Sequence, residues 1–459
     1  MSFDREPSWG QPRRREVLAA TLGAVAVGLA AGLSGCAGPG SVPRPTSAGV
    51  GSAPGADADR VAALAAVLRS RAQAYARGDR DAWLAAVSSG AGADQAREDA
   101  AAYELMRALG VTRLSYAEPR VSDGVVASDL SYVVAGVDTA SCVVPTTWDP
   151  SVLPPRRLGV PAAPWEQGGM AVARRDRVVV VAGAPAAPES TAPESTVPAS
   201  MVAAEVLSHA LDAVAAVQRL WGEPGASAVL LLPPSPAIFA RWAGDQDSAA
   251  SLPAVTVGPV VGGRSTGCDR VVVNPDAWRQ LRPDGRRVVL THEVTHLVLR
   301  RDVGGEMPGW LAEGYCEYVA YAGVDLPEAA IVAPLLREVR RSGVPPHLPS
   351  QSAIDGQHTL LGANTGEPPG FNPTAAATPT PGGTAELDRS AAYAAALLAC
   401  RVLAERAGPD GLTGLVRQAR GSDLRDGGVA GPLRRIAGWT PDDLERAWRD
   451  RVHALAALP

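Results

Sequence analysis

The chain has 459 residues, with 43 basic and 48 acidic side chains and a formal net charge of −5. This length allows two or three domains. The near balance of charge gives no overall basic field that would favour nucleic-acid binding. The composition excludes a multi-span membrane protein, a fibrous protein and a disulfide miniprotein. Gly (48) and Pro (40) are frequent, which indicates loops and linkers.

Residues 1–36 are typical of an export signal. Three arginines at 13–15 precede an apolar, Gly-interrupted run over 17–33. That run is at the short limit for a membrane-spanning helix, and a basic segment before it is typical of secretion. The ending Leu-Ser-Gly-Cys resembles a bacterial lipobox, and the arginines resemble a twin-arginine signal. The resemblance implies lipidation of Cys36 and a chain held at the extracytoplasmic face of the cell membrane.

Export would place the mature chain where disulfides persist. Apart from Cys36, four cysteines remain and allow three pairings, among which the sequence does not choose. Free buried thiols are the alternative. No Cys-x-x-Cys spacing favours a Cys-ligated zinc site. The four cysteines are Cys142, Cys268, Cys316 and Cys400.

The first folded unit is expected over 58–183, after a flexible tether at 37–57. Apolar residues repeat at helical spacing from Val61 to Ala72, two further helices follow to Leu109, and strands are expected after residue 114. Helices followed by strands predict an α+β module. The pattern resembles the NTF2-like fold. It contains no catalytic constellation, and we expect its Trp83 and Trp165 to pack in the core.

A linker over 184–200 contains Ala-Pro-Glu-Ser-Thr twice in tandem and cannot bury a core. The second domain, 201–459, is predicted to be mainly helical with a small sheet, so the chain as a whole is α+β. A Thr/Pro/Gly-rich stretch at 362–386 predicts a disordered surface loop. The elements expected in chain order are a helix around 207–217, strands at 228–232, 255–257 and 271–273, and helices at 285–300, 308–321, 327–341, 389–407, 411–420 and from 440 onwards.

The helix at 285–300 carries His292-Glu293-Val294-Thr295-His296, the HExxH pattern. Residues four apart share a helix face, so both imidazoles can reach one metal ion. Apolar residues fill the rest of this helix, and buried polar groups are costly unless they are paired. A bound metal ion supplies such a partner. Chance and two surface histidines are the alternatives, and the apolar flanks argue against the second.

The next helix offers a third ligand in Trp310-Leu311-Ala312-Glu313-Gly314. Here the chain resembles the gluzincin metallopeptidases, in which a Glu on a second helix completes a zinc site after HExxH. The resemblance implies one Zn²⁺ bound by His292, His296 and Glu313. Glu313 follows His296 after 16 residues (297–312), so the connecting loop must be short. Glu317 follows after 20 residues (297–316) and is the alternative ligand. Otherwise it is an acceptor for a ligand imidazole or a solvated charge.

A zinc site of this kind predicts hydrolysis of peptide bonds, with Glu293 as general base. Tyr393 is our candidate for a hydrogen-bond donor to the oxyanion, with a core residue as the equal alternative. Tyr315 and Tyr318 are expected to pack. The remaining histidines have no partner at ligand spacing and are expected to be structural or exposed: His209, His347, His358 and His453.

Two functions remain open. The first is a lipid-anchored zinc metallopeptidase, more consistent with an endopeptidase because no amine-binding motif precedes HExxH. The second is a non-proteolytic binding or scaffolding lipoprotein that keeps the zinc-peptidase fold. Glu293 discriminates between them, because a purely structural metal site has no need of it. The expected partners are a peptide or protein substrate and the membrane, with no nucleic acid.

Overall fold

The computed structural model describes residues 54–88, 93–122, 125–149, 156–158, 163–184, 197–222, 226–244, 252–261, 263–303, 306–355, 387–421 and 427–458. The predicted export signal with Cys36, most of the tether and the loop at 362–386 lie outside these residues, as do residues 185–196 of the linker. Residues 54–57, which the sequence assigns to the tether, already belong to the first described helix.

The first unit has three helices followed by an antiparallel sheet, as the sequence predicts. The helices are α2 (Pro54–Arg77), α3 (Arg80–Ser88) and α4 (Ala93–Leu109). The sheet has the order β1-β3-β4-β5, with β2 also paired to β3. Its strands are β1 (Val111–Tyr116), β2 (Arg120–Ser122), β3 (Val125–Val134), β4 (Cys142–Asp149) and β5 (Arg156–Leu158). Trp83 and Trp165 are buried in the core of this part, which confirms that they pack.

A second, mixed sheet has the order β6-β7-β8-β12-β9. β7 and β8 are parallel and are joined through helix α5 (Ala199–Trp221), while β6 and β9 are antiparallel edge strands. A separate two-stranded ribbon pairs β10 (Val260–Val261) with β11 (Arg264–Ser265). The five strands are β6 (Met170–Arg175), β7 (Val178–Gly183), β8 (Ala228–Leu232), β9 (Ala254–Val257) and β12 (Arg270–Val273).

Strands β6 and β7 correct the predicted boundary at residue 184. The sequence assigns residues 170–183 to the first unit, but β7 pairs with β8 along its length. All six residues of β7 are buried, because β7 lies inside the sheet with layers on both of its faces. The second structural unit therefore begins near Met170, and the linker leads from β7 to helix α5 of the same unit rather than from one domain to the next.

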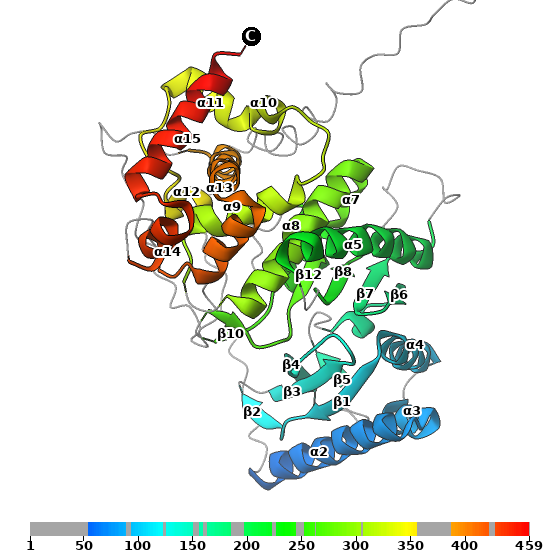
Figure 1. Ribbon diagram of the computed structural model, residues 1–459. Coiled ribbons are helices and arrows are strands. Elements are labelled where there is room, and N and C mark those ends of the chain that lie inside the picture. Colours follow the sequence, from blue (N-terminus) through cyan, green and yellow to red (C-terminus); the bar gives the residue numbers. More distant parts are fainter. Residues whose placement is uncertain are drawn as a thin grey trace, which may run out of the picture.

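The second sheet lies between two layers of different origin (Figure 1). Val178 and Val180 point to the face covered by α5 and by α8 (Pro283–Asp302). Val179 and Val181 point to the opposite face, where they share a core with Tyr103 of α4 and with residues of the first unit. Because side chains point alternately to the two faces of β7, this strand packs against helices of the second unit on one face and against the first unit on the other.

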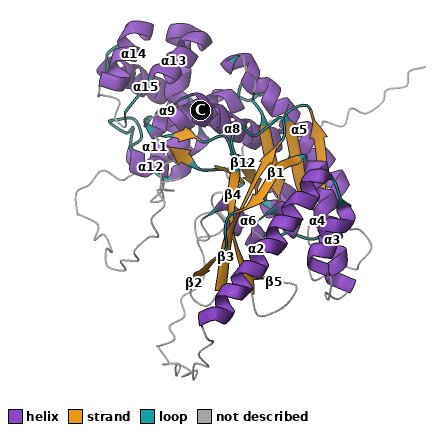
Figure 2. Cartoon of the chain, turned by 90° about the horizontal axis from the view of Figure 1, so that it is seen from below, coloured by secondary structure: helices purple, strands orange, loops and turns teal. Residues whose placement is uncertain are grey.

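Helices build the remainder of the molecule, and α13, α14 and α15 gather at one end of it (Figure 2). Helix α13 spans the break predicted near residue 408, where Gly408 takes φ 78° and kinks the helix. Thr440 caps the last helix through a reciprocal pair of hydrogen bonds with Asp443. The bounds are α6 (Pro236–Ala243), α7 (Pro275–Gln280), α9 (Gly309–Ala320), α10 (Glu328–Ile331), α11 (Ala333–Ser342), α12 (Gln351–Asp355), α13 (Arg389–Gln418), α14 (Gly427–Ala437) and α15 (Pro441–Ala456).

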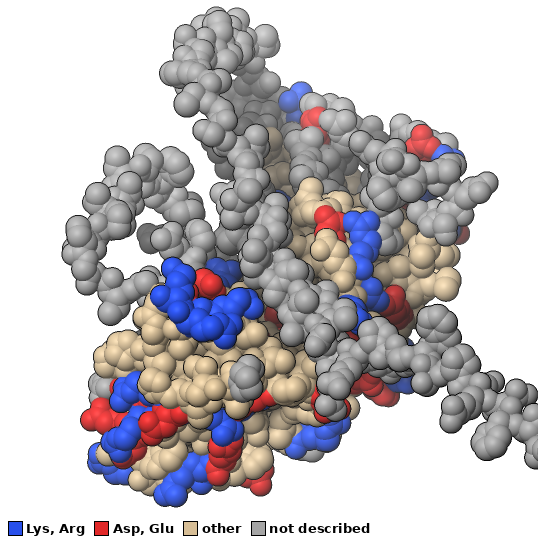
Figure 3. Space-filling view, turned by 90° about the horizontal axis from the view of Figure 1, so that it is seen from above, with Lys and Arg blue, Asp and Glu red and all other residues tan. Residues whose placement is uncertain are grey.

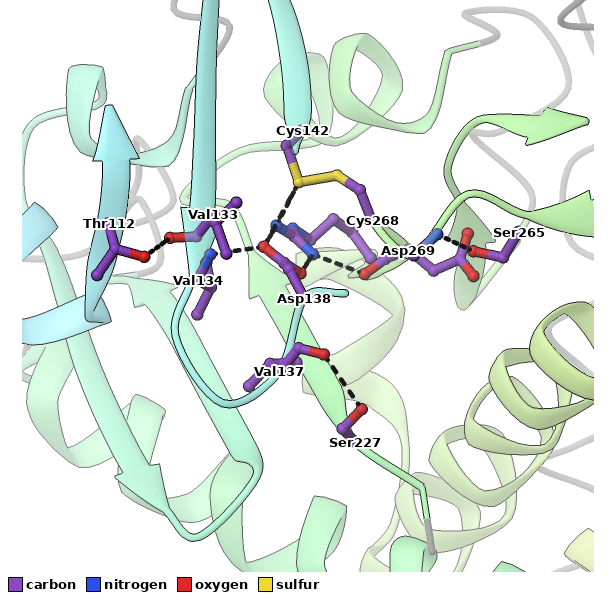
Figure 4. A network of polar contacts seen from close by, with 12 residues as sticks. Thr112, Val133, Val134, Val137, Asp138, Cys142, Ser227, Ser265, Cys268 and Asp269 are labelled. Carbon is purple, nitrogen blue, oxygen red and sulfur yellow. Dashed lines mark hydrogen bonds and ion pairs between the residues drawn. A yellow bond between two sulfur atoms is a disulfide. The ribbon is translucent and has the colours of Figure 1, made fainter. Parts of the chain in front are cut away.

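A disulfide and a buried ion pair join the two sheets (Figure 4). Cys142 at the start of β4 is bonded to Cys268, two residues before β12. Beside the disulfide, Arg270 of β12 donates to both carboxylate oxygens of Asp138, at 2.7 and 2.9 Å. Of the three pairings open to the sequence, the structure therefore selects Cys142–Cys268. Cys316 and Cys400 are free and buried.

One described helix, α5, is long and apolar enough to cross a membrane. Val202, Val206 and Ala210 lie on its buried face, against the second sheet. A core helix that packs one face against a sheet is apolar for this reason, so the hydropathy of α5 is explained by its packing.

Candidate metal centre

Helix α8 carries the HExxH residues through the middle of the second unit. Its residues from Val288 to Arg300 are all buried. Two threonines of this segment are satisfied within the helix, because Thr291 and Thr295 each donate to the carbonyl oxygen four residues earlier, at 2.7 Å. The imidazoles of His292 and His296 are buried and point towards the neighbouring helix α9. Their polar nitrogens therefore need partners from α9 or from a bound ligand.

Three side-chain atoms from α8 and α9 form a small triangle. The Nε2 atoms of His292 and His296 are 3.1 Å apart. Glu313 Oε2 lies 3.2 Å from His292 Nε2 and 3.4 Å from His296 Nε2. The structure therefore brings together the two imidazoles and the carboxylate that the sequence selected as ligands.

Glu313 Oε2 is buried and has no hydrogen-bond partner. The two imidazole nitrogens are near enough for an ion pair, but the contacts lack the direction of a hydrogen bond. An unsatisfied carboxylate oxygen inside a protein costs free energy, and a cation at the centre of the triangle would remove that cost. The donor set thus fits a metal ion.

The same carboxylate and imidazoles shift each other's pKa in the metal-free state. Burial alone would lower the pKa of His292, but the nearby carboxylates of Glu313 and Glu317 outweigh it and raise that pKa well above the ordinary value. Burial would raise the pKa of Glu313, but the His296 and His292 imidazoles hold it well below the usual range. Glu313 is therefore ionised, while His292 holds a proton until a metal ion displaces it.

Cys316 lies three residues after Glu313 on α9 and is fully buried. One ligand atom each from His292, His296 and Cys316 lie within 4.8 Å of one another, so this buried group could hold a metal ion. Burial, followed by the charge of Glu313, raises the pKa of the Cys316 thiol well above its usual value. Because a thiol must lose its proton to bind a metal, Cys316 would have to release this proton on binding, whereas Glu313 is already ionised in the metal-free state.

Glu317, one turn after Glu313, contacts the other nitrogen of the first histidine. Glu317 Oε1 lies 3.0 Å from His292 Nδ1. A proton on Nδ1, held by this carboxylate, leaves Nε2 free to bind a metal ion. The geometry suits Glu317 as an acceptor for a ligand imidazole rather than as the third ligand.

Glu293 extends from α8 towards the edge of the second sheet. The hydroxyl of Thr256 on β9 lies 2.7 Å from Glu293 Oε2 and 3.0 Å from the Glu293 carbonyl oxygen. The sequence analysis missed Thr256. Its position in a short strand gives no motif, and only the pairing of β9 with β12 brings it beside α8.

Tyr393 lies on α13 and stacks on His292, with ring centroids 6.1 Å apart and planes 14° apart. Close packing of α9 and α13 explains this position. A side chain at Gly314 would come within 2.4 Å of the Ala396 carbonyl oxygen, so the glycine of the Trp-Leu-x-Glu-Gly motif allows α13 to approach. Burial raises the pKa of Tyr393 well above its usual value, so its hydroxyl stays protonated and able to donate.

Tyr315, His209, His347 and His453 of the described residues lie apart from the three ligand atoms. Tyr315 is fully buried, and its hydroxyl hydrogen-bonds to Thr413 at 2.9 Å, which confirms that it packs. His209 lies edge-to-face with Trp278, and the exposed His347 pairs with Glu445 at 3.2 Å. His453 is exposed, while His358 lies outside the described residues.

Acidic and basic side chains are interspersed over the face seen in Figure 3, apart from one small basic group. This distribution agrees with the net charge of −5. The face shows no continuous basic stripe of the kind that follows a nucleic-acid backbone.

The chain was compared with known proteins. No protein-family model matches it, and a search of curated proteins also finds no match. The geometry of the centre is therefore the main indication of what the protein does.

Proposed function

We propose that this protein is a zinc-dependent metallopeptidase of the gluzincin type, with His292, His296 and Glu313 as ligands and Glu293 as general base. The observation that carries the proposal is the triangle of ligand atoms, 3.1, 3.2 and 3.4 Å apart, with an unsatisfied oxygen on Glu313. Tetrahedral zinc with ligand bonds of about 2.0–2.1 Å separates its ligand atoms by about 3.3 Å. The second unit is then a gluzincin-like domain and the first an NTF2-like module.

Bound zinc would supply Lewis-acid polarisation of a peptide carbonyl and of a water molecule. Glu293 takes the proton from that water and passes it to the leaving amine, as a buried carboxylate beside the ligands can. Tyr393 donates a hydrogen bond to the developing oxyanion. Glu317 holds the proton on His292 Nδ1 and so fixes the ligand tautomer. These roles belong to three side chains: Glu293 on α8, Glu317 on α9 and Tyr393 on α13.

A peptide substrate is supported by the position of strand β9. It is the last strand of the second sheet, paired on one side with β12, and its Thr256 contacts Glu293. The outer edge of such a strand offers backbone donors and acceptors to an extended peptide. A peptide added there would run past the general base, which favours cleavage within a chain and thus an endopeptidase.

The export signal completes the proposal. With lipid on Cys36, the enzyme would be anchored at the extracytoplasmic face of the cell membrane, where the Cys142–Cys268 disulfide can persist. Its substrates would then be extracytoplasmic peptides or proteins.

The test compares wild type with Glu293→Gln by metal analysis and by a peptide-library assay. We expect about one zinc per chain in both proteins, and a loss of hydrolysis of about 10²–10⁴-fold in the variant. Glu338→Gln is the matched control, since Glu338 is also buried but pairs with Arg341 on α11, and it should keep full activity. Zinc-loaded wild type that cleaves no peptide would refute the peptidase and favour the binding or scaffolding alternative.

A further inference from the structure

The contact between Thr256 and Glu293 joins the sheet edge to the proposed general base. We propose that Thr256 is a positioning residue whose hydroxyl orients the Glu293 carboxylate for proton transfer. This inference rests on the proposed function and adds a residue from β9 to the machinery on α8, α9 and α13.

The hydroxyl of Thr256 has one proton and two acceptors within reach. Its distance to Glu293 Oε2 is 2.7 Å, and its distance to the Glu293 carbonyl oxygen is 3.0 Å. A hydroxyl bonded to an ionised carboxylate gives the shorter and stronger hydrogen bond. The Thr256 hydroxyl therefore donates its hydrogen bond to Glu293 Oε2. Among the described residues none hydrogen-bonds to Glu293 Oε1, so this oxygen is available to a substrate water.

The backbone of β9 holds Thr256 in place from two sides. Thr256 pairs with Val271 in the antiparallel register of β9 and β12. Two residues later, the Gly258 carbonyl oxygen accepts a hydrogen bond of 2.7 Å from Arg300, which lies on the same helix α8 as Glu293. Helix α8 thus contacts the strand at Thr256 and again at Gly258.

Arg300 is itself fixed by the part of the chain that carries the disulfide. Its guanidinium donates to Asp269 Oδ1 at 3.0 and 3.2 Å, and Asp269 follows the disulfide-bonded Cys268 directly. The strand, the helix and the disulfide loop therefore form one rigid frame around the hydroxyl. A carboxylate with three side-chain torsions loses much of its rotational freedom when such a frame holds one oxygen.

The test uses Thr256→Val, which removes the hydroxyl but keeps the shape, and Thr256→Ser, which keeps the hydroxyl. We expect Thr256→Val to lower kcat about tenfold with KM changed less than about twofold, and Thr256→Ser to restore most of kcat. In a Glu293→Gln background, Thr256→Val should have no further effect. The matched control is Thr112→Val, because the Thr112 hydroxyl also bonds across a sheet, to the Val133 carbonyl at 3.2 Å, but lies in the first unit.

A second measurement does not depend on activity. Crystal structures of the zinc-loaded variants should show Glu293 in one rotamer in wild type and Thr256→Ser, and in a changed or divided rotamer in Thr256→Val. Thr256→Ala serves in place of Thr256→Val should the valine variant not fold. Unchanged kcat together with an unchanged Glu293 rotamer would overturn the inference. If wild type cleaves no peptide, the peptidase fails, and the rotamer of Glu293 alone still decides whether Thr256 positions it.

Discussion

Two buried charged clusters of this molecule differ in whether their polar atoms are satisfied. At the junction of the sheets, Asp138 receives two hydrogen bonds from Arg270 and a third, of 2.7 Å, from the backbone N–H of Val134. At the metal centre, Glu313 Oε2 has two imidazoles beside it and no hydrogen bond. The first cluster is complete without a ligand, whereas the second could hold a metal ion.

An unsatisfied oxygen is informative only together with the groups around it. The buried Arg71–Asp99 pair on α2 and α4 also leaves Asp99 Oδ2 without a partner. Its net charge is balanced, however, and Arg71 cannot bind a metal ion because its guanidinium stays protonated. Glu313 differs because two imidazole nitrogens, both potential ligands, converge on the same oxygen. The charge balance of a cluster and the ability of its side chains to bind metal therefore distinguish a structural ion pair from a candidate metal site.

Removing the Glu313 carboxylate tests the difference between the two clusters most directly. In the proposed zinc site Glu313 is one of three ligands, so Glu313→Ala should weaken zinc binding about a thousandfold, on the order of 4 kcal/mol. Cys316→Ser on the same helix is the matched variant and should change the affinity less than about threefold. Competition with a chromophoric chelator measures both. The opposite order of effects would make Cys316 the third ligand.

The complete cluster should respond in stability rather than in metal binding. Asp138→Asn leaves the buried Arg270 charge without its counter-ion, so the free energy of unfolding should fall by about 3 kcal/mol. Urea denaturation of the oxidised protein measures this change. Asp129→Asn is the control, since Asp129 pairs with Arg120 at a more exposed position, and it should cost less than about 1 kcal/mol. Loss of zinc from the folded Asp138→Asn protein would show that the two clusters are coupled.

The smallest expected effect is a dependence of zinc affinity on pH. The raised pKa of His292 means that the metal-free centre holds a proton at neutral pH, and zinc must displace it. Apparent zinc affinity should therefore fall as pH falls, by about tenfold, or 1.4 kcal/mol, for each pH unit between about 8 and 6. The lowered pKa of Glu313 keeps that ligand ionised over this range. Calorimetry in buffers of different ionisation heat measures the released proton, and an affinity independent of pH would contradict the assignment.

Local periodicity made much of the centre predictable from the sequence. His292 and His296 share a face because a helix repeats every 3.6 residues, and the apolar flanks placed that face inside the protein. Glu313 followed from a motif on the next helix. Glu317 followed from its position one turn later. The sequence left its role as ligand or acceptor open, and its contact with His292 Nδ1 supports the acceptor.

Contacts between distant segments were not predictable in the same way. β7 reads as a strand in the sequence, yet its pairing with β8, across the linker, was not encoded in any local pattern. The same holds for Thr256, whose hydroxyl reaches Glu293 only through the register of β9 with β12. Gly314 was visible in the sequence as part of a motif. The need for glycine at this position comes from the close approach of α13, which only the packing of the helices shows.

The α+β class, the long helices of the second unit and the spacing of His292, Glu293 and His296 could be predicted from the sequence, because these depend on interactions within a few residues. Helices α6, α7, α12 and α14 were not predicted. The tertiary structure decided which cysteines pair, where the units divide and which side chains surround the centre. Those outcomes depend on the packing of separate segments of the chain. Thr256 and Glu293 are 37 positions apart, and Cys142 and Cys268 are separated by 126 positions. The physical reason is that helix periodicity acts locally, whereas burial and hydrogen-bond satisfaction are properties of the whole fold.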